Sequence, residues 1–321
     1  MEAQYVLGID IGGTYTKIAI FTEKGNMCAD WEIPTIPENG GSFVLSAVAQ
    51  SVHDKLFEMG IPLSQVAGAG MGMPGYIDSE RGTIVSSVNI GWKQYPAAWE
   101  LSKLLEVPVL IDNDANLAAA GEYWQGAGKH GEDLLFLTIG TGIGCGIIIG
   151  GKVLYGTGAG IAGEAGHITV IQEGGETCKC GKNGCLETVA SAPGIIRLAK
   201  REAQREGYSL LDAKKNWTTK DVFDLAEAGD RAAKTAVNKA MQYLGLAAAN
   251  AAALLNPSRI VIGGGVSAAG EKLLTPLRKH FYYYALERVK QGTELQLAEL
   301  GNKAGVTGAA WLALTGKGGQ Q

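Results

Sequence analysis

The sequence predicts an α/β fold with two domains, and three observations lead to that prediction. The chain has 321 residues, which is long enough for two domains. A strand, a turn rich in glycine and threonine, and a second strand occur at 6–20 and again at 134–149. Later apolar runs typical of strands are each followed by segments with helical periodicity, as in an α/β protein. We therefore expect an internal duplication, with one copy in each domain.

The composition excludes several classes of function. Hydrophobic residues make up 46% of the chain and charged residues 19%, with a net charge of −4 and a pI near 5.7. No block of Lys and Arg is present, which argues against nucleic acid or an anionic membrane as the main partner. The longest uncharged stretch, 134–151, is broken by glycines, and the N-terminus does not resemble a signal peptide. We expect a cytoplasmic protein with no membrane and no nucleic-acid partner.

The expected elements can be placed along the chain in order. In the first half they are strands at 5–11, 15–21, 31–33, 66–73 and 107–111, and helices at 43–59, 99–105 and 115–123. In the second half they are strands at 134–139, 145–149 and 259–262, a helical region over 194–255 with breaks at 214–219 and 229, a helix from about 268 and a closing helix within 301–314. Both glycine turns lie between two strands and do not open a helix, so a dinucleotide-binding motif is excluded.

The two glycine turns are candidate phosphate sites. Glycines let successive backbone N–H groups point the same way and form a concave anion site. The candidate residues are Gly12, Gly13 and Thr14 in the first turn and Thr141 and Gly142 in the second, with Lys17 within reach of a phosphate. Asp10 ends the first strand, where its carboxylate could hold the hydration shell of Mg²⁺. One such turn alone would be an ordinary tight hairpin, but two related copies favour a ligand.

A run of polar residues, Asp112-Asn113-Asp114, follows an apolar strand and precedes an alanine-rich helix. Capping the helix explains part of this run, but three polar residues exceed what a cap needs. Ligand sites gather at the carboxyl ends of strands in α/β sheets. A carboxylate here, Asp114, could accept the proton of an attacking hydroxyl as a general base.

Three cysteines and one histidine have the spacing of a metal site. Cys178, Cys180 and Cys185 lie in a stretch kinked by glycines, and His167 is the natural fourth ligand because no other cysteine lies nearby. A closed set of three cysteines and one histidine predicts a structural Zn²⁺, whereas a metal-free, reduced cluster is the alternative. The two remaining cysteines, Cys28 and Cys145, lie in strand-like runs and are expected to be buried thiols.

Several other positions give weaker signals. Glu164 and Glu187 bracket the cysteine cluster, and from chemistry alone each could be a sugar ligand or a surface carboxylate. The runs 263–266 and 301–306 are rich in glycine and could let backbone approach a flat adenine, although such glycines often serve packing only.

Five motifs together resemble the ROK family (repressor, open reading frame, kinase) of bacterial sugar kinases and regulators, most closely its ATP-dependent glucokinases. LGIDIGGTYTK and LTIGTGIGCGIII are similar to the two phosphate motifs, and IDNDANLAAAGE to the catalytic segment. GEAGHITV resembles the sugar and metal segment, and CKCGKNGCLE the zinc knuckle. The resemblance covers essentially the whole chain, with the motifs in the family's order and spacing.

The resemblance implies an actin-like, ribonuclease-H-like ATPase fold with two α/β domains around a cleft. We expect a smaller domain of 1–115 plus about 302–321, and a larger one of 116–301 that carries the knuckle. The implied reaction is phosphorylation of glucose at O6 by Mg-ATP, with Asp114 as the general base. The resemblance also implies that the protein is a homodimer. Glucose would be bound by Asn89, Asn113, Asp114, Glu164, His167 and Glu187. Mg-ATP would lie among Asp10, Gly12, Gly13, Thr14, Thr141 and Gly142, with Gly264 and Gly265 near the adenosine.

Three alternatives stay open at this point. Kinases for mannose, fructose or an N-acetylhexosamine share these motifs, and the choice depends on the pocket around C2 of the sugar. A sugar-sensing regulator without catalysis would need a changed base or a DNA-binding segment, and only about five residues precede the first strand. Polyphosphate as donor is disfavoured because no basic track for a long polyanion is present.

Overall fold

The computed structural model describes residues 4–128, 133–157, 161–213 and 216–316, and it divides into two compact units. The first comprises Met1–His130, Tyr155–Ile161 and Asn302–Gln321, and the second comprises Gly131–Leu154 and Ala162–Gly301. The first unit thus extends past the boundary expected at residue 115. Helix α4 (Asp114–Gln125) belongs to it because this helix packs against α11 (Ala304–Thr315).

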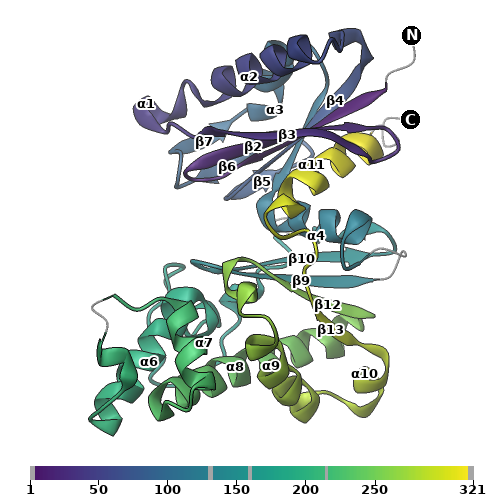
Figure 1. The fold of residues 1–321 in the computed structure, drawn as a ribbon. Coiled ribbons are helices and arrows are strands. Elements are labelled where there is room, and N and C mark those ends of the chain that lie inside the picture. Colours follow the sequence, from purple (N-terminus) through teal and green to yellow (C-terminus); the bar gives the residue numbers. More distant parts are fainter. Residues whose placement is uncertain (1–3, 129–132, 158–160, 214–215, 317–321) are drawn as a thin grey trace. The chain divides into compact units, whose positions relative to one another are not determined.

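The first unit is built on a five-stranded sheet in the order β3–β2–β1–β4–β8. The strands β1, β2 and β3 are antiparallel neighbours, whereas β1, β4 and β8 run parallel. The alternation of side chains sends Leu7 and Ile9 to the face covered by α2 and α3, and Val6 to the face covered by α11 (Figure 1). The bounds are β1 (Tyr5–Ile11), β2 (Tyr15–Thr22), β3 (Met27–Pro34), β4 (Val66–Met73), β8 (Val109–Asn113), α2 (Val44–Glu58) and α3 (Ala97–Leu105).

Helix α11 lies directly on the backbone of this sheet. A Cβ at Gly8 would overlap the carbonyl oxygen of Val306, and a Cβ at Gly70 would overlap that of Ala309. Any larger residue at these two strand positions would push the helix away from the sheet. Part of the high glycine content, 47 residues, is therefore explained by close approach between elements.

Some short elements of the first unit were not predicted from the sequence. They are a three-stranded antiparallel sheet of β5 (Tyr76–Asp78), β6 (Thr83–Ser87) and β7 (Trp92–Tyr95), with α1 (Glu38–Gly41), η1 (Leu63–Gln65) and η5 (Gly301–Lys303). These strands have three to five residues, too few to show a clear alternation.

The second unit repeats the topology of the first. Its sheet has the order β11–β10–β9–β12–β13, where β9, β10 and β11 are antiparallel neighbours and β9, β12 and β13 run parallel. This matches the first sheet strand for strand and confirms the predicted duplication, although β11 and β13 were not expected. The bounds are β9 (Leu134–Ile139), β10 (Ile143–Ile149), β11 (Lys152–Val153), β12 (Arg259–Gly263) and β13 (Glu294–Leu297).

The predicted helical region, 194–255, forms three helices, α6, α7 and α8, which together with α9 build the hydrophobic core of the second unit against β9 and β10 (Figure 1). A capping box of Thr218 and Asp221 starts α7, and the side chain of Asp230 caps α8. The bounds are η2 (Ala165–His167), α5 (Glu187–Ala190), α6 (Ala192–Glu206), η3 (Leu210–Ala213), α7 (Thr219–Glu227), α8 (Arg231–Leu255), η4 (Gly265–Ala269), α9 (Glu271–Tyr284) and α10 (Glu287–Gly292).

The expectation for the two isolated cysteines is half right. Cys145 is buried, and burial raises the pKa of its thiol to about 12. Cys28 is exposed, because it lies on the edge strand β3, whose residues alternate between half-buried and exposed. Among the described residues, no helix is long and apolar enough to cross a membrane.

Candidate active site

The first glycine turn closes the hairpin of β1 and β2, as predicted. The N–H of Gly12 donates to the carbonyl oxygen of Tyr15 at 3.0 Å, while Gly13 and Thr14 are exposed at the tip. Asp10 is the cross-strand partner of Lys17, whose ammonium also donates to the carbonyl oxygen of Asn302 at 3.1 Å. The turn thus presents free backbone and a hydroxyl to solvent, with one acid and one base on the strands behind it.

The carboxylate of Asp10 lies against the first turn of α11. A Cβ at Gly305 would be 2.5 Å from Asp10 Oδ2, so only glycine leaves room for the carboxylate. The glycine run at 301–306 was a candidate for contact with adenine. In the structure, Gly305 of this run lies against the Asp10 carboxylate. Burial, and then the charge of Asp114, raise the pKa of Asp10 to about 6, and Lys17 opposes them.

The general-base candidate is set at the junction of β8 and α4. Asn113 caps the helix, because its Oδ1 accepts from the N–H of Ala115 at 2.8 Å, and its Nδ2 donates to the carbonyl oxygen of Gly75 at 3.0 Å. Asp114 is the first residue of α4 and accepts from the same N–H at 2.9 Å. The capping expected from the sequence is confirmed, and it fixes Asn113 and Asp114 together.

Asp112, the first residue of the polar run, has a different environment from its neighbours. Its side chain is buried, at 2% exposure, and burial raises its pKa. Tyr155 donates to Oδ2 at 2.6 Å, Asn116 Nδ2 donates to Oδ1 at 3.0 Å, and the N–H of Asn113 donates to Oδ1 at 2.6 Å. No sequence motif pointed to Tyr155, which is 43 residues from its partner.

Asn89 lies in the connection between β6 and β7 of the small sheet. A Cβ at Gly13 would be 3.8 Å from its Nδ2, so the structure brings this amide beside the first phosphate turn. The first unit therefore gathers Asp10, the Gly12–Thr14 turn and Asn89, and it couples the charge of Asp114 to that of Asp10.

In the second unit, the predicted metal ligands lie together. The ligand atoms of His167, Cys178, Cys180 and Cys185 all lie within 4.8 Å of one another. Nδ1 of the histidine is 3.5 Å from Cys178 Sγ, and Cys180 Sγ is 3.6 Å from Cys185 Sγ. Three thiols and one imidazole at this spacing fit a tetrahedral Zn²⁺, whose bonds to sulfur are about 2.3 Å and to nitrogen about 2.0–2.1 Å.

Both predicted sugar carboxylates of this unit lie beside the histidine. Glu164 Oε2 is 3.8 Å from His167 Nε2, and Glu187 Oε1 is 3.9 Å from His167 Nδ1. A Cβ at Gly142 would be 2.9 Å from Glu187 Oε2. Glu187 therefore lies next to the second glycine turn, in which Thr141 is exposed and the N–H of Gly140 donates to the carbonyl oxygen of Gly142 at 2.9 Å.

The glycines after β12 lie at the end of the same sheet. Gly264 has a positive φ of 80°, and a Cβ there would be 2.5 Å from the carbonyl oxygen of Ile139, so glycine is required. A Cβ at Gly265 would meet nothing within 4 Å. The first residue therefore serves close packing against β9, while the second faces open space.

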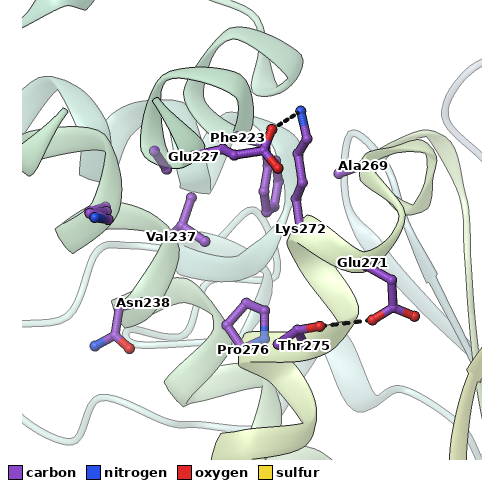
Figure 2. A pocket seen from close by; sticks show the side chains of 11 residues that line it. Phe223, Glu227, Val237, Asn238, Ala269, Glu271, Lys272, Thr275 and Pro276 are labelled. Atoms are coloured by element: carbon purple, nitrogen blue, oxygen red, sulfur yellow. Dashed lines mark hydrogen bonds and ion pairs between the residues drawn. The ribbon is translucent and has the colours of Figure 1, made fainter. Parts of the chain in front are cut away.

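A cavity of about 650 Å³ adjoins the end of η4 (Figure 2). Its apolar wall comes from α7, α8, η4 and α9, and charged and amide groups stand around it. The lining residues are Phe223, Ala226, Glu227, Lys234, Val237, Asn238, Ala269, Glu271, Lys272, Thr275 and Pro276. An apolar volume of this size with a few polar groups fits a small organic ligand.

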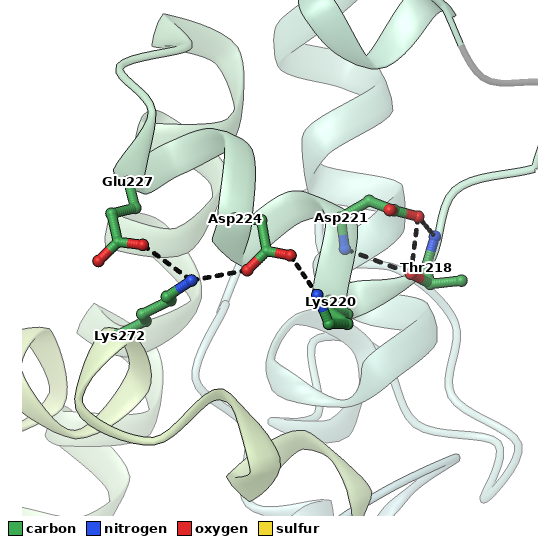
Figure 3. Close-up of polar contacts among 6 residues, drawn as sticks. All are labelled: Thr218, Lys220, Asp221, Asp224, Glu227 and Lys272. Carbon is green, nitrogen blue, oxygen red and sulfur yellow. Dashed lines mark hydrogen bonds and ion pairs between the residues drawn. The ribbon is translucent and has the colours of Figure 1, made fainter.

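Lys272 joins two helices at the rim of this cavity. Its ammonium is 2.7 Å from Asp224 Oδ1 and 2.8 Å from Glu227 Oε2, so α9 is tied to α7 (Figure 3). Asp224 is in turn paired with Lys220 at 2.5 Å. Sequence reasoning missed this cluster, because charges spaced along exposed helices do not reveal which helix faces which.

Known proteins resemble the chain over nearly its whole length. Residues 6–316 match the model of the ROK family. A glucokinase of Halalkalibacterium halodurans is 46% identical over 316 residues, which are 97% of this chain and 96% of that protein. The crystal structure of a ROK family glucokinase from Streptomyces griseus, in complex with glucose and AMPPNP, has a TM-score of 0.77 and 34% identity and covers 96% of this chain and 98% of its own.

A regulator has the same fold. The crystal structure of a ROK family transcriptional regulator, a homologue of the E. coli MLC protein, has a TM-score of 0.86 and 28% identity and covers 97% of this chain but 78% of the regulator. The duplicated sheets of this chain thus have the expected actin-like, ribonuclease-H-like ATPase fold. The chain belongs to the ROK family.

Proposed function

We propose that this protein is a hexokinase-type phosphotransferase, a glucokinase, which transfers the γ-phosphoryl group of ATP to O6 of glucose. The relatives named glucokinase, at 46% and 34% identity over almost the full chain, support this activity. The observation that carries it is the position of Asp10 near the end of β1 and of Asp114 directly after β8, because β1 and β8 both run parallel to β4 and the charge of Asp114 raises the pKa of Asp10. Asp10 ends the strand before a phosphate turn, and Asp114 starts a helix beside it, as a metal-nucleotide site with a neighbouring base requires.

In this proposal the residues of the chain position the reactants and move one proton. Asp114 accepts the proton of the 6-hydroxyl as the oxygen attacks the γ-phosphorus. The backbone of Gly12, Gly13 and Gly142 and the hydroxyls of Thr14 and Thr141 hold phosphate oxygens. Mg²⁺, when bound with ATP, would neutralise phosphate charge, and Asp10 is the residue that would hold its water shell. The ammonium of Lys17 donates to the carbonyl oxygen of Asn302, so a phosphate would have to compete for it.

The sugar contacts are proposed for six residues. Hydroxyls of glucose would be bound by Asn89, Asn113, Asp114, Glu164, His167 and Glu187, whose amide, carboxylate and imidazole groups are the kinds that a sugar needs. The histidine would serve twice. Its Nδ1 faces the thiol of Cys178 and would bind Zn²⁺, while its Nε2 lies towards Glu164 and would face the sugar. A structural zinc would fix the ring and so orient a specificity residue.

We propose that the adenosine of ATP binds in the cavity next to η4, with Gly264 and Gly265 at the start of this element near the adenosine. The apolar wall from Phe223, Val237 and Ala269 suits a purine ring, and Lys272 with Glu227 suits the ribose edge. We expect Ala226→Trp, which places a large side chain in the cavity, to raise KM for ATP and to leave KM for glucose unchanged.

Steady-state kinetics of Asp114→Asn and Asp114→Ala test the reaction. Removal of the base should lower kcat by about 100-fold to 10,000-fold, the usual contribution of general-base catalysis, with the protein still folded. Near-normal turnover in either variant would rule out Asp114 as the base. The sugar specificity is tested by comparing kcat/KM for glucose, mannose, N-acetylglucosamine, N-acetylmannosamine and fructose.

A sugar-sensing regulator is the second candidate, because the family includes regulators with the same fold. It predicts tight glucose binding with no phosphoryl transfer, which calorimetry and a coupled kinase assay distinguish.

A homodimer and a cytoplasmic location complete the proposal. The free cysteines of the chain fit a reducing compartment, and light scattering of the purified protein measures the oligomeric state.

A further inference from the structure

The strongest network outside the proposed ligand contacts surrounds Asp112. This carboxylate is 2% exposed and accepts three hydrogen bonds, from Tyr155, Asn116 and the N–H of Asn113. A buried carboxyl group with this many donors is held in one orientation, since losing any donor leaves a buried oxygen atom with an unmade hydrogen bond.

The network is continuous with the residues that carry the proposed base. Asp112 Oδ1 binds the N–H of the next residue, Asn113, whose side chain caps α4 and donates to the carbonyl oxygen of Gly75. Asp114 begins the helix that this cap starts, and Asn116, two positions further into it, donates a hydrogen bond back to Asp112. The orientation of Asp112 therefore fixes the backbone from which the Asp114 side chain projects.

Tyr155 is the member of the network that comes from outside this segment. It follows β11 and starts Tyr155–Ile161, a piece of chain grouped with the first unit although both flanking segments belong to the second. Its phenol donates to Asp112 Oδ2 at 2.6 Å from a half-buried ring. The proposed sugar ligand Glu164 follows shortly after this piece.

We propose that Tyr155 is a positioning residue for phosphoryl transfer, which acts through Asp112 to hold Asn113 and Asp114 in the orientation that proton abstraction needs. This role rests on the proposed function, because it presumes that Asp114 is the base. The phenol touches neither sugar nor nucleotide in this scheme, and its effect reaches the reaction only through the Asp112 carboxylate.

The experiment compares Tyr155→Phe with Tyr284→Phe. Tyr284 lies on α9 in the second unit, where its phenol oxygen accepts from Gln242 Nε2 at 2.9 Å, so each variant loses one tyrosine hydroxyl that takes part in side-chain hydrogen bonding. We expect Tyr155→Phe to lower kcat per folded molecule about tenfold, with KM for glucose and ATP within twofold of wild type. A displacement of about 1 Å at a reacting group costs about 100-fold, and here two of the three donors remain. Tyr284→Phe should keep wild-type kcat.

A double-mutant cycle with Asp112→Asn separates positioning from packing. If Tyr155 acts through Asp112, adding Tyr155→Phe to Asp112→Asn changes kcat by less than twofold. If each substitution instead acted through its own packing effect, the two fold-changes in kcat would multiply. Full multiplication in this cycle, or a kcat of Tyr155→Phe within twofold of wild type, overturns the proposal.

Hydrogen exchange followed by mass spectrometry gives a readout that does not depend on activity. Amides of 112–117 should exchange at least tenfold faster in Tyr155→Phe than in wild type or Tyr284→Phe. Unchanged exchange there overturns the inference, even if the wild-type protein proves to phosphorylate no sugar. Absence of turnover in wild type would instead refute the proposed function, so the two failures are distinguishable.

Discussion

Replacing Asp10 by asparagine should make the protein more stable at neutral pH and less active. The carboxylate of Asp10 lies against the first turn of α11, and burial together with the charge of Asp114 raises its pKa from 3.8 to about 6. Above pH 6 the folded protein must therefore keep an ionised group where the neutral form is favoured. Asparagine has nearly the same shape and carries no charge, so it removes this cost.

The magnitude follows from the pKa difference. A shift from 3.8 to about 6 is about 2 units, and one unit corresponds to about 1.4 kcal/mol, so the ionised carboxylate destabilises the fold by at most about 3 kcal/mol. Solvent screens part of this cost, because the residue is only half-buried. The positive end of α11 also favours an ionised carboxylate, by about 0.3–1 kcal/mol. We expect Asp10→Asn to raise the free energy of unfolding by about 1–2 kcal/mol at pH 8.

The sign of the pH dependence is fixed by the same shift. Because the folded pKa is raised, wild type loses stability relative to Asp10→Asn as the pH rises from about 4 to about 6. Above pH 6 both the folded and the unfolded forms of wild type are ionised at this position, so the difference stays constant. Below pH 4 both forms are protonated, and the two proteins should be equally stable.

Urea denaturation followed by tryptophan fluorescence suits this measurement. Five of the six tryptophans lie in the first unit, where Asp10 is: Trp31, Trp92, Trp99, Trp124 and Trp311. Asp54→Asn is a matched control, since Asp54 is an exposed carboxylate on α2 of the same unit. Comparing each variant with wild type at the same pH cancels the titration of every other group.

Two results would refute the reasoning. One is an Asp10→Asn protein no more stable than wild type at pH 8, which would mean that the carboxylate is compensated in the fold. The other is a stability gain that is the same at pH 4 and pH 8, which would trace it to packing instead of charge. Loss of kinase activity in the stabilised variant would fit the proposed role in holding Mg-ATP, as stability is often sacrificed at functional sites.

Three further outcomes can be measured on the same protein. Gly70→Ala should destabilise it by about 1–3 kcal/mol in urea, because the added methyl overlaps α11, whereas Gly292→Ala, with nothing within 4 Å, should not. Iodoacetamide should label the exposed Cys28 well before Cys145, whose pKa of about 12 leaves it protonated, as peptide mapping would show. Cys185→Ser should purify with less than one zinc per chain by elemental analysis and unfold at lower temperature.

Much of the fold was readable from local patterns. The strand at 5–11 follows from a short apolar run, the hairpin turns follow from glycine, and the knuckle follows from cysteine spacing. What the sequence could not show depends on residues distant along the chain. Gly305 makes room for Asp10 from the opposite end of the chain, and Tyr155 reaches Asp112 across 43 residues. No periodicity encodes such pairs, because they arise only after the sheets and helices have packed.

The duplication explains which charges the second copy lacks. In the first hairpin, the second cross-strand pair counted from the turn is Asp10 opposite Lys17. The second cross-strand pair of the second hairpin is Thr138 opposite Gly144. The second turn therefore has no acid or base on its own strands. Its carboxylate comes from Glu187, which lies 2.9 Å from where a Cβ on Gly142 would be and belongs to the helix that follows the knuckle. In the proposed enzyme, the acid and base that interact with the metal ion and the phosphates thus come from the strands of the first copy. In the second copy, the phosphate turn lies next to a proposed sugar ligand, which in turn lies beside the proposed zinc site. The substitution Thr138→Asp would put a second carboxylate beside the phosphates without a lysine to balance its charge. We expect this variant to bind ATP more weakly.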